Sequence, residues 1–144
     1  SVMLAAELLA RPHYLDLAPE ILERGLSGRL VISPRGEERH VPRFVEFHAG
    51  AANFPWRSQA EWIGMQMAAR LGLDRDMAQR AARGAFRSDL FRAALAPVHA
   101  DLPSASAKIE GGMRADAPAA SAGGKLFLCR DAFFDGRSFE PSSR

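Results

Sequence analysis

The sequence predicts a mainly α-helical chain with a few short strands and long irregular loops. Helix start and stop signals recur between residues 2 and 97, and the β-like stretches are short. The segment 116–124 is rich in Ala, Gly, Pro and Ser, a composition typical of a loop. With 144 residues, 47% of them hydrophobic and 25% charged, we expect a single domain over residues 1–144 with a sizeable core.

Two helices are expected near the start of the chain. The first runs over about 2–11 and is ended by Pro12. The second begins at 18–19, where a proline occupies the favoured first turn, and stops before Gly28.

A short β-like segment follows the second helix. Residues 29–33 read as a strand, and 34–36 (Pro-Arg-Gly) read as a turn. Residues 37–47 are expected to be extended and irregular, because Pro42 argues against a central strand.

The best-defined helix begins at Ser58. Ser58 and Glu61 have the spacing of a capping box, in which each side chain bonds a free backbone N–H at the start of a helix. We expect this helix to end near Leu71, with Gly72 as a left-handed cap.

Two further helices should follow. Asp74 is placed to cap a helix over 75–86 whose apolar stripe comprises Met77, Ala78, Ala81, Ala82 and Ala85. Ser88 or Asp89 is expected to cap a short helix that Pro97 ends. Beyond it, 125–129 reads as a short strand and the tail from residue 131 reads as irregular.

Known catalytic and metal-binding patterns are absent from the sequence. The four histidines, His13, His40, His48 and His99, lie far apart without metal-ligand spacing. No Walker, G-x-S-x-G or G-x-G-x-x-G signature occurs. The lone Cys129 reads as a small, buried apolar residue. We therefore expect no metal, no cofactor and no enzymatic activity.

Nucleic-acid binding is a weaker alternative. The helices predicted over 58–71 and 75–86 superficially match a helix-turn-helix. Arginines that could face phosphates are Arg75, Arg80, Arg83 and Arg87. The net charge is only +2, and the candidate recognition helix is alanine-rich, so we do not expect nucleic acid as a partner.

Export and membrane signals are not visible either. Residues 2–10 are apolar, but they are too few to span a bilayer and no basic region precedes them. They read as the core face of a helix.

Four stretches of the sequence resemble one protein family. They are Ala5–Leu15 (AAELLARPHYL), Phe54–Trp62 (FPWRSQAEW), Phe86–Arg92 (FRSDLFR) and Phe133–Pro141 (FFDGRSFEP). In this order they resemble motifs in the C-terminal part of the nitrate- and bicarbonate-binding solute receptors of ABC importers, a family that includes cytoplasmic nitrate sensors. The chain departs from the usual motifs at Gln59 (often His), Phe91 (usually Tyr) and Glu140 (usually Asp).

The resemblance implies a fold and a function for a longer parent protein. The fold would be the C-terminal part of a two-lobed, periplasmic-binding-protein-like (type II) receptor. The parent would bind nitrate, nitrite or bicarbonate and signal to the importer's membrane subunits from the periplasm. A cytoplasmic sensor acting on a regulatory protein, or a receptor-like domain of an importer ATPase, is the alternative.

The resemblance also assigns mainly structural roles to the motif residues. Two interpretations of Trp56 and Arg57 stand side by side: a guanidinium beside an aromatic face can bind a planar oxyanion, or Trp56 anchors the loop while Arg57 bonds carbonyls or a carboxylate. We favour the structural interpretation, because the family's anion contacts belong mainly to segments preceding this part. Structural roles are likewise expected for Phe54, Pro55, Ser58, Glu61, Trp62, Asp135 and Gly136, the last two in a turn that pins the tail.

Overall fold

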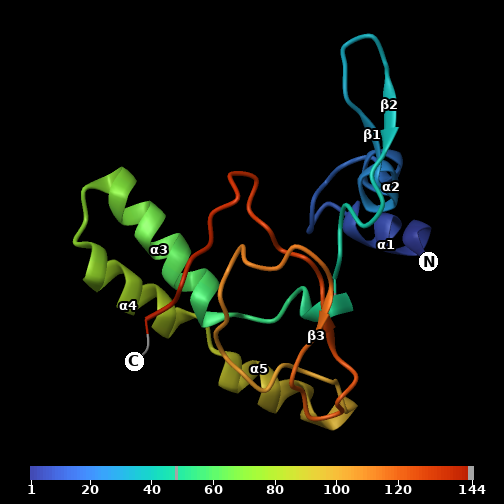
Figure 1. The fold of residues 1–144 in the computed structure, drawn as a ribbon. Helices are drawn as coiled ribbons and strands as arrows, with labels where there is room; N and C mark the ends of the chain where they lie inside the picture. The colour runs from blue at the N-terminus through green and yellow to red at the C-terminus, as the bar shows by residue number, and fades with distance from the viewer. Residues whose placement is uncertain (48, 143–144) are drawn as a thin grey trace. The chain divides into compact units, whose positions relative to one another are not determined.

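The computed structural model describes residues 1–47 and 49–142, which form a mainly helical chain with two small antiparallel sheets (Figure 1). The chain divides into two compact units, residues 1–47 and residues 48–144. Whether the chain folds as a single domain, as expected, stays a prediction, because a compact unit need not fold alone.

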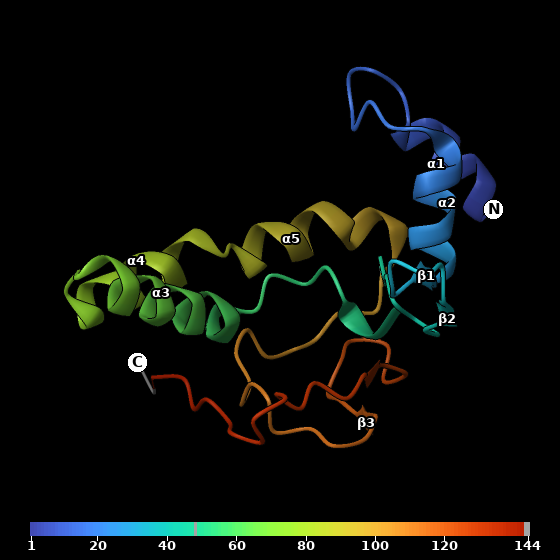
Figure 2. The ribbon, with the colours of Figure 1, turned by 90° about the horizontal axis from the view of Figure 1, so that it is seen from above.

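The smaller unit contains two helices that lie side by side, α1 (Val2–Leu9) and α2 (Pro19–Ser27) (Figure 2). Helix α1 ends two residues earlier than predicted. Pro19 begins α2, and Gly28 ends it in the left-handed conformation with φ of 72°. A side chain at Gly28 would also collide with the carbonyl of Val41, so glycine is required there.

A short hairpin completes the smaller unit. Strand β1 (Arg29–Val31) pairs antiparallel with β2 (Glu38–His40), with Leu30 opposite Arg39. Residues 37–47 were expected to be extended and irregular, and the structure differs in that 38–40 form the paired strand β2. Pro42 lies just outside the paired residues, so it removes no hydrogen bond from the ladder.

The larger unit begins with the 3-10 turn η1 (Ala49–Ala51) and a helical hairpin, α3 (Arg57–Leu71) and α4 (Arg75–Ala85) (Figure 1). Gly72 ends α3 in the left-handed conformation, and the Asp74 carboxylate caps α4 by accepting from the N–H of Met77 at 2.7 Å. Both features confirm the sequence analysis.

The two helices of the hairpin approach closely at Gly64. A Cβ there would lie 2.7 Å from the carbonyl oxygen of Ala78 and 2.8 Å from the methyl group of Ala82. Of the apolar stripe predicted for α4, Ala78 and Ala82 are half-buried. The remaining members of the stripe, Met77, Ala81 and Ala85, are exposed, so the prediction is only partly right.

The rest of the larger unit comprises one helix and long loops. Helix α5 (Ser88–Leu95) runs into the 3-10 turn η2 (Ala96–Val98), which contains the predicted helix-ending Pro97. Strands β3 (Ala117–Pro118) and β4 (Phe127–Leu128) pair antiparallel, so the predicted loop 116–124 is interrupted by β3. The tail is irregular, as predicted, apart from a bridge between Phe139 and Glu110.

The capping box predicted at Ser58 is wrong. Helix α3 begins at Arg57, its N-cap is Trp56, and no side chain caps it. Ser58 and Glu61 are instead fully buried, and their side chains bond residues far away in sequence. Neither Ser88 nor Asp89 is an N-cap, since α5 begins at Ser88 after Arg87.

The core of the larger unit surrounds the loop that leads into α3. Its buried members are Ala51, Phe54, Trp56 and Leu128, with Phe91, Leu102, Met113, Ala119 and Leu126 packed against them. Phe54 meets the rings of Trp56 and Phe91 edge to face, at 4.8 and 5.8 Å between centroids. Among the described residues, no helix combines the length and apolarity needed to cross a membrane.

Candidate functional site

Two of the sequence motifs meet in the larger unit. The ring of Trp62, in the 54–62 motif, lies 5.3 Å from the ring of Phe133 in the terminal motif. The Glu61 carboxylate accepts from the backbone N–H of Ser142 at 3.0 Å. The start of α3 and the C-terminal tail therefore form one structural assembly.

A partly buried polar cluster, which we term the Lys108 cluster, lies next to this junction and comprises Ser58, Lys108, Glu110 and Asp131. The Ser58 hydroxyl donates to Glu110 Oε1 at 2.5 Å and accepts from the N–H of Lys108 at 3.1 Å. The Lys108 ammonium donates to Glu110 Oε2 at 2.6 Å and to the carboxylate of Asp131. One lysine thus serves two carboxylates, which leaves the cluster with a net charge of −1 when all three groups are ionised.

Further contacts hold Lys108 and Asp131 in place. Lys108 Nζ lies 5.7 Å from the centre of the Trp56 ring, within cation–π range. Asp131 Oδ1 accepts from the N–H of Met113 at 2.9 Å. Side-chain exposure is 4% for Glu110, 16% for Lys108 and 24% for Asp131, so only Asp131 has appreciable access to water.

A small cavity of about 260 Å³ opens beside the Lys108 cluster. It is lined by Gln59, Trp62, Ile63, Glu110, Asp131 and Phe133. The two aromatic rings form one wall and the two carboxylates belong to the cluster. This cavity is the candidate site, because both motifs and the buried charges converge on it.

Trp56 and Arg57 have the contacts of the structural interpretation. Trp56 is 4% exposed and packs in the core. The backbone N–H of Arg57 donates to the carbonyl of Ser106 at 2.8 Å, and the Arg57 guanidinium lies 3.6 Å from Asp89 Oδ1. The Nε atom of Arg57 is buried and has no hydrogen-bond partner within the described part of the chain. A ligand-binding role for this pair stays a prediction.

Asp89, in the first turn of α5, also forms an ion pair with a second arginine, Arg87. The Arg87 guanidinium donates to both of its carboxylate oxygens, with the shortest bond at 2.6 Å. These hydrogen bonds hold the pKa of Asp89 well below its ordinary value and raise the pKa of Arg87. Asp89 therefore lies within ion-pair distance of two arginines, Arg57 and Arg87.

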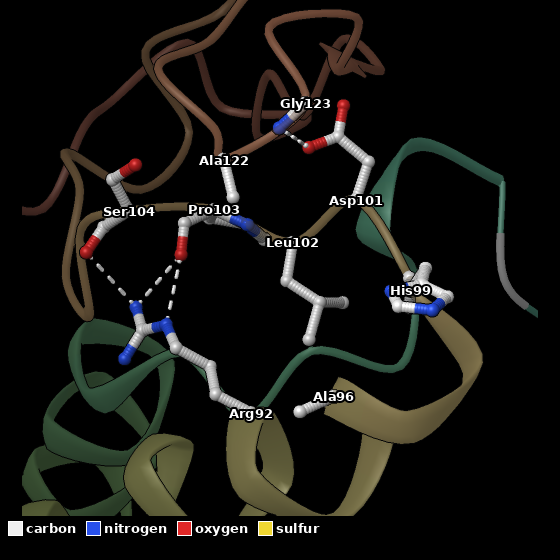
Figure 3. Close-up of a pocket in the computed structure, with 10 residues that line it drawn as sticks. Arg92, Ala96, His99, Asp101, Leu102, Pro103, Ser104, Ala122 and Gly123 are labelled. Carbon is white, nitrogen blue, oxygen red and sulfur yellow. Dashed lines mark hydrogen bonds between the residues drawn. The ribbon is translucent and has the colours of Figure 1, made fainter.

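A larger hollow of about 620 Å³ lies beside α5 (Figure 3). Arg92 points to the carbonyls of Pro103 and Ser104, and it donates to both. On the other side Asp101 accepts from the N–H groups of Gly123 and Lys125, at 2.7 and 3.0 Å. These N–H groups, with the Ser121 side chain, lower the pKa of Asp101. The charged side chains of this hollow, Arg92 and Asp101, therefore bond the backbone of the loops that line it.

Two of the four arginines of the helix-turn-helix alternative form ion pairs. Arg83 forms an ion pair with the buried Glu61, and Arg87 pairs with Asp89. Arg75 donates to the sulfur of Met65 at 2.9 Å, and Arg80 is exposed. Arg83 and Arg87 are therefore held by carboxylates of the same unit, and whether the chain binds nucleic acid stays a prediction.

The remaining predicted residues have ordinary structural positions. His13, His40 and His99 remain separate, and His48 lies outside the described residues; across the described ranges, no cluster of three or more His, Cys, Asp or Glu side chains could hold a metal ion. Cys129 is only partly buried, and a Cβ at Gly50 would collide with its sulfur.

The turn predicted in the tail is confirmed. Asp135 Oδ1 accepts from the N–H of Arg137 at 3.0 Å, and Gly136 has a positive φ of 70°.

Sequence reasoning did not single out Lys108, Glu110 or Asp131. Lysine occurs only at positions 108 and 125 in a chain whose other basic residues are arginines. The scarcity of lysine was the available signal for a special role at position 108, because an ammonium is a compact charge that can bond two carboxylates at once.

Comparison with known proteins returned no match among family models, curated proteins or solved structures. The class of protein is therefore argued from the motifs and from the geometry of the larger unit.

Proposed function

We propose that the chain is the C-terminal portion of a solute-binding receptor for nitrate, nitrite or bicarbonate that serves an ABC importer. The observation that carries this proposal is the position of the 54–62 motif. Phe54, Trp56, Ser58, Ala60 and Glu61 are each 4% exposed or less, so the motif is the buried centre of its unit.

A motif used for packing supports this assignment over a catalytic one. Glu61 accepts hydrogen bonds from Arg83 of α4 and from the backbone of the tail, and Ser58 donates to Glu110. These contacts fix one region of a scaffold and engage the Ser58 and Glu61 side chains of the motif in bonds within the protein. A receptor binds its solute without changing it, and its scaffold needs only to be rigid.

Uncovered apolar side chains also support a parent with further segments. Ile63, Met67 and Leu71 lie one turn apart along α3 and are 41%, 51% and 63% exposed. Leu73 and Met77 of the same hairpin are 51% and 59% exposed. An apolar stripe of this kind is typical of a surface that another part of a protein covers.

The mechanism would be closure of two lobes on the anion, in a periplasmic-binding-protein-like (type II) fold. The closed state would signal to the importer's membrane subunits from the periplasm. In the alternative settings it would signal to a regulatory protein in the cytoplasm, or within an importer ATPase.

The test compares the 144-residue chain with its full-length parent by calorimetry. The parent is expected to give saturable heat with nitrate, nitrite or bicarbonate, and none with chloride at equal ionic strength. The isolated chain should give none at submillimolar anion, because part of the donor shell is replaced by water. A parent that binds none of the three anions would contradict the proposal. Tight binding by the chain, abolished in Arg57→Ala, would instead move the anion site to Trp56 and Arg57.

A further inference from the structure

We infer that the cavity between Trp62, Phe133 and the Lys108 cluster binds a small primary alkylammonium ion. The inference joins three properties of this cavity: its net negative charge, its aromatic wall and its size. The inference is independent of the proposed anion receptor, because it concerns a different site: a cavity with a net negative charge repels anions.

The charge follows from the composition of the cluster. Glu110 and Asp131 both line the cavity, and among the described residues Lys108 is the one cation that forms an ion pair with them. The Lys108 ammonium already donates to both carboxylates and lies near the Trp56 ring. One carboxylate charge therefore remains uncompensated in a partly desolvated site, where an incoming cation is attracted strongly.

The aromatic wall adds a second preference for a cation. The rings of Trp62 and Phe133 lie 5.3 Å apart and are tilted by 37°. Aromatic faces carry negative electrostatic potential and attract ammonium groups within about 6 Å. Together with Ile63 they also offer apolar surface to an alkyl chain.

The way in which the carboxylate oxygens are already bonded favours an ammonium over a guanidinium as the ligand. Glu110 Oε1 accepts from Ser58 and Oε2 from Lys108, while Asp131 Oδ1 accepts from Met113 and Oδ2 from Lys108. No carboxylate presents two open oxygens to a planar fork. An ammonium needs only single lone pairs, and the exposed Gln59 amide at the rim supplies another acceptor.

The volume sets the length of the ligand. At about 260 Å³ the cavity lies below the range of about 300–1,000 Å³ that holds drug-sized ligands. A short, unbranched amine such as n-butylammonium fits this size class.

The test is an NMR titration of the 144-residue chain with n-butylammonium, followed at the indole N–H of Trp62. The neutral isostere 1-butanol is the matched control ligand. We expect a saturable shift of the Trp62 signal with the amine and at least a tenfold weaker response with the alcohol. The Trp56 indole, buried behind Lys108, should shift less.

Two lysine substitutions localise the site without touching the buried cluster. Gln59→Lys places a positive charge at the rim, and we expect binding of n-butylammonium to weaken at least tenfold. Gln66→Lys adds the same charge two turns further along α3, outside the cavity lining, and should change binding less than twofold.

Three results would overturn the inference. They are equal shifts with 1-butanol, which would indicate an apolar cavity only; unchanged amine binding in Gln59→Lys; or a Trp62 shift driven by nitrate. Failure here would leave the anion binding of the parent untouched, because that experiment uses another ligand and another protein.

Discussion

The Ser58 hydroxyl donates a 2.5 Å hydrogen bond to the carboxylate of Glu110, a residue 52 positions further along the chain. Both side chains are buried. The bond joins the first turn of α3 to the loop that carries Lys108 and Glu110. Ser58 has the sequence spacing of a helix cap, but its side chain forms a long-range tie between two segments.

Removing this tie should destabilise the larger unit. Ser58→Ala leaves a buried carboxylate oxygen and the Lys108 N–H without their partner, which we expect to cost about 1–3 kcal/mol. Urea unfolding followed by tryptophan fluorescence measures this directly, because both tryptophans lie in the larger unit. Ser104→Ala, at an exposed serine, is the control.

Ser58→Asp separates the tie from a helix cap. Aspartate is a good N-cap, so a capping role predicts stability close to wild type. In the structure an aspartate would place a second carboxylate beside buried Glu110, and we expect it to be worse than alanine. A Ser58→Asp variant more stable than Ser58→Ala would contradict the buried tie.

Trp56→Ala should be among the most damaging substitutions. The ring is 4% exposed and packs on Phe54, so its truncation is expected to cost about 3–5 kcal/mol. Phe134→Ala is the matched control, since that ring is fully exposed. In a Trp62→Phe background, Trp56 should emit as a buried indole; a water-exposed emission maximum would remove the basis of this prediction.

Arg83→Met tests the ion pair that links α4 to α3. Glu61 is 1% exposed, and without Arg83 its charge is buried and uncompensated, which should cost roughly 3 kcal/mol. The same change at exposed Arg80 on α4 should have little effect. If Glu61→Leu in the Arg83→Met background fails to recover stability, the loss comes from packing and not from the charge.

The Asp101 carboxylate predicts a specific acid sensitivity. Its pKa in the folded chain lies below the ordinary 3.8, chiefly because it accepts from the Gly123 N–H. A lowered folded pKa means that the stabilisation is present above about pH 4 and is lost as pH falls through the folded value. Asp101→Asn should therefore be less stable than wild type at pH 7, and the difference should shrink towards pH 2. Urea midpoints at both pH values test this; a constant difference would show that the charge is not responsible.

Local signals in the sequence predicted the helices and several of their ends. Pro19, Gly72 and Asp74 act through their own backbone or through neighbours three residues away. The helix ends that they set can therefore be predicted from the sequence alone. The short strand near Phe127 and the turn at Gly136 were predicted for the same reason.

Only the tertiary structure decided what the polar side chains do. Ser58 and Glu61 match a capping box in sequence, yet their partners are Glu110, Lys108, Arg83 and Ser142. The Lys108 cluster draws its members from three separate segments, around residues 58, 108–110 and 131, and no local pattern encodes which carboxylates a lysine meets. Burial is the physical reason: once the 54–62 motif is enclosed, each polar group must find a partner within the protein, and the fold determines which partners are near.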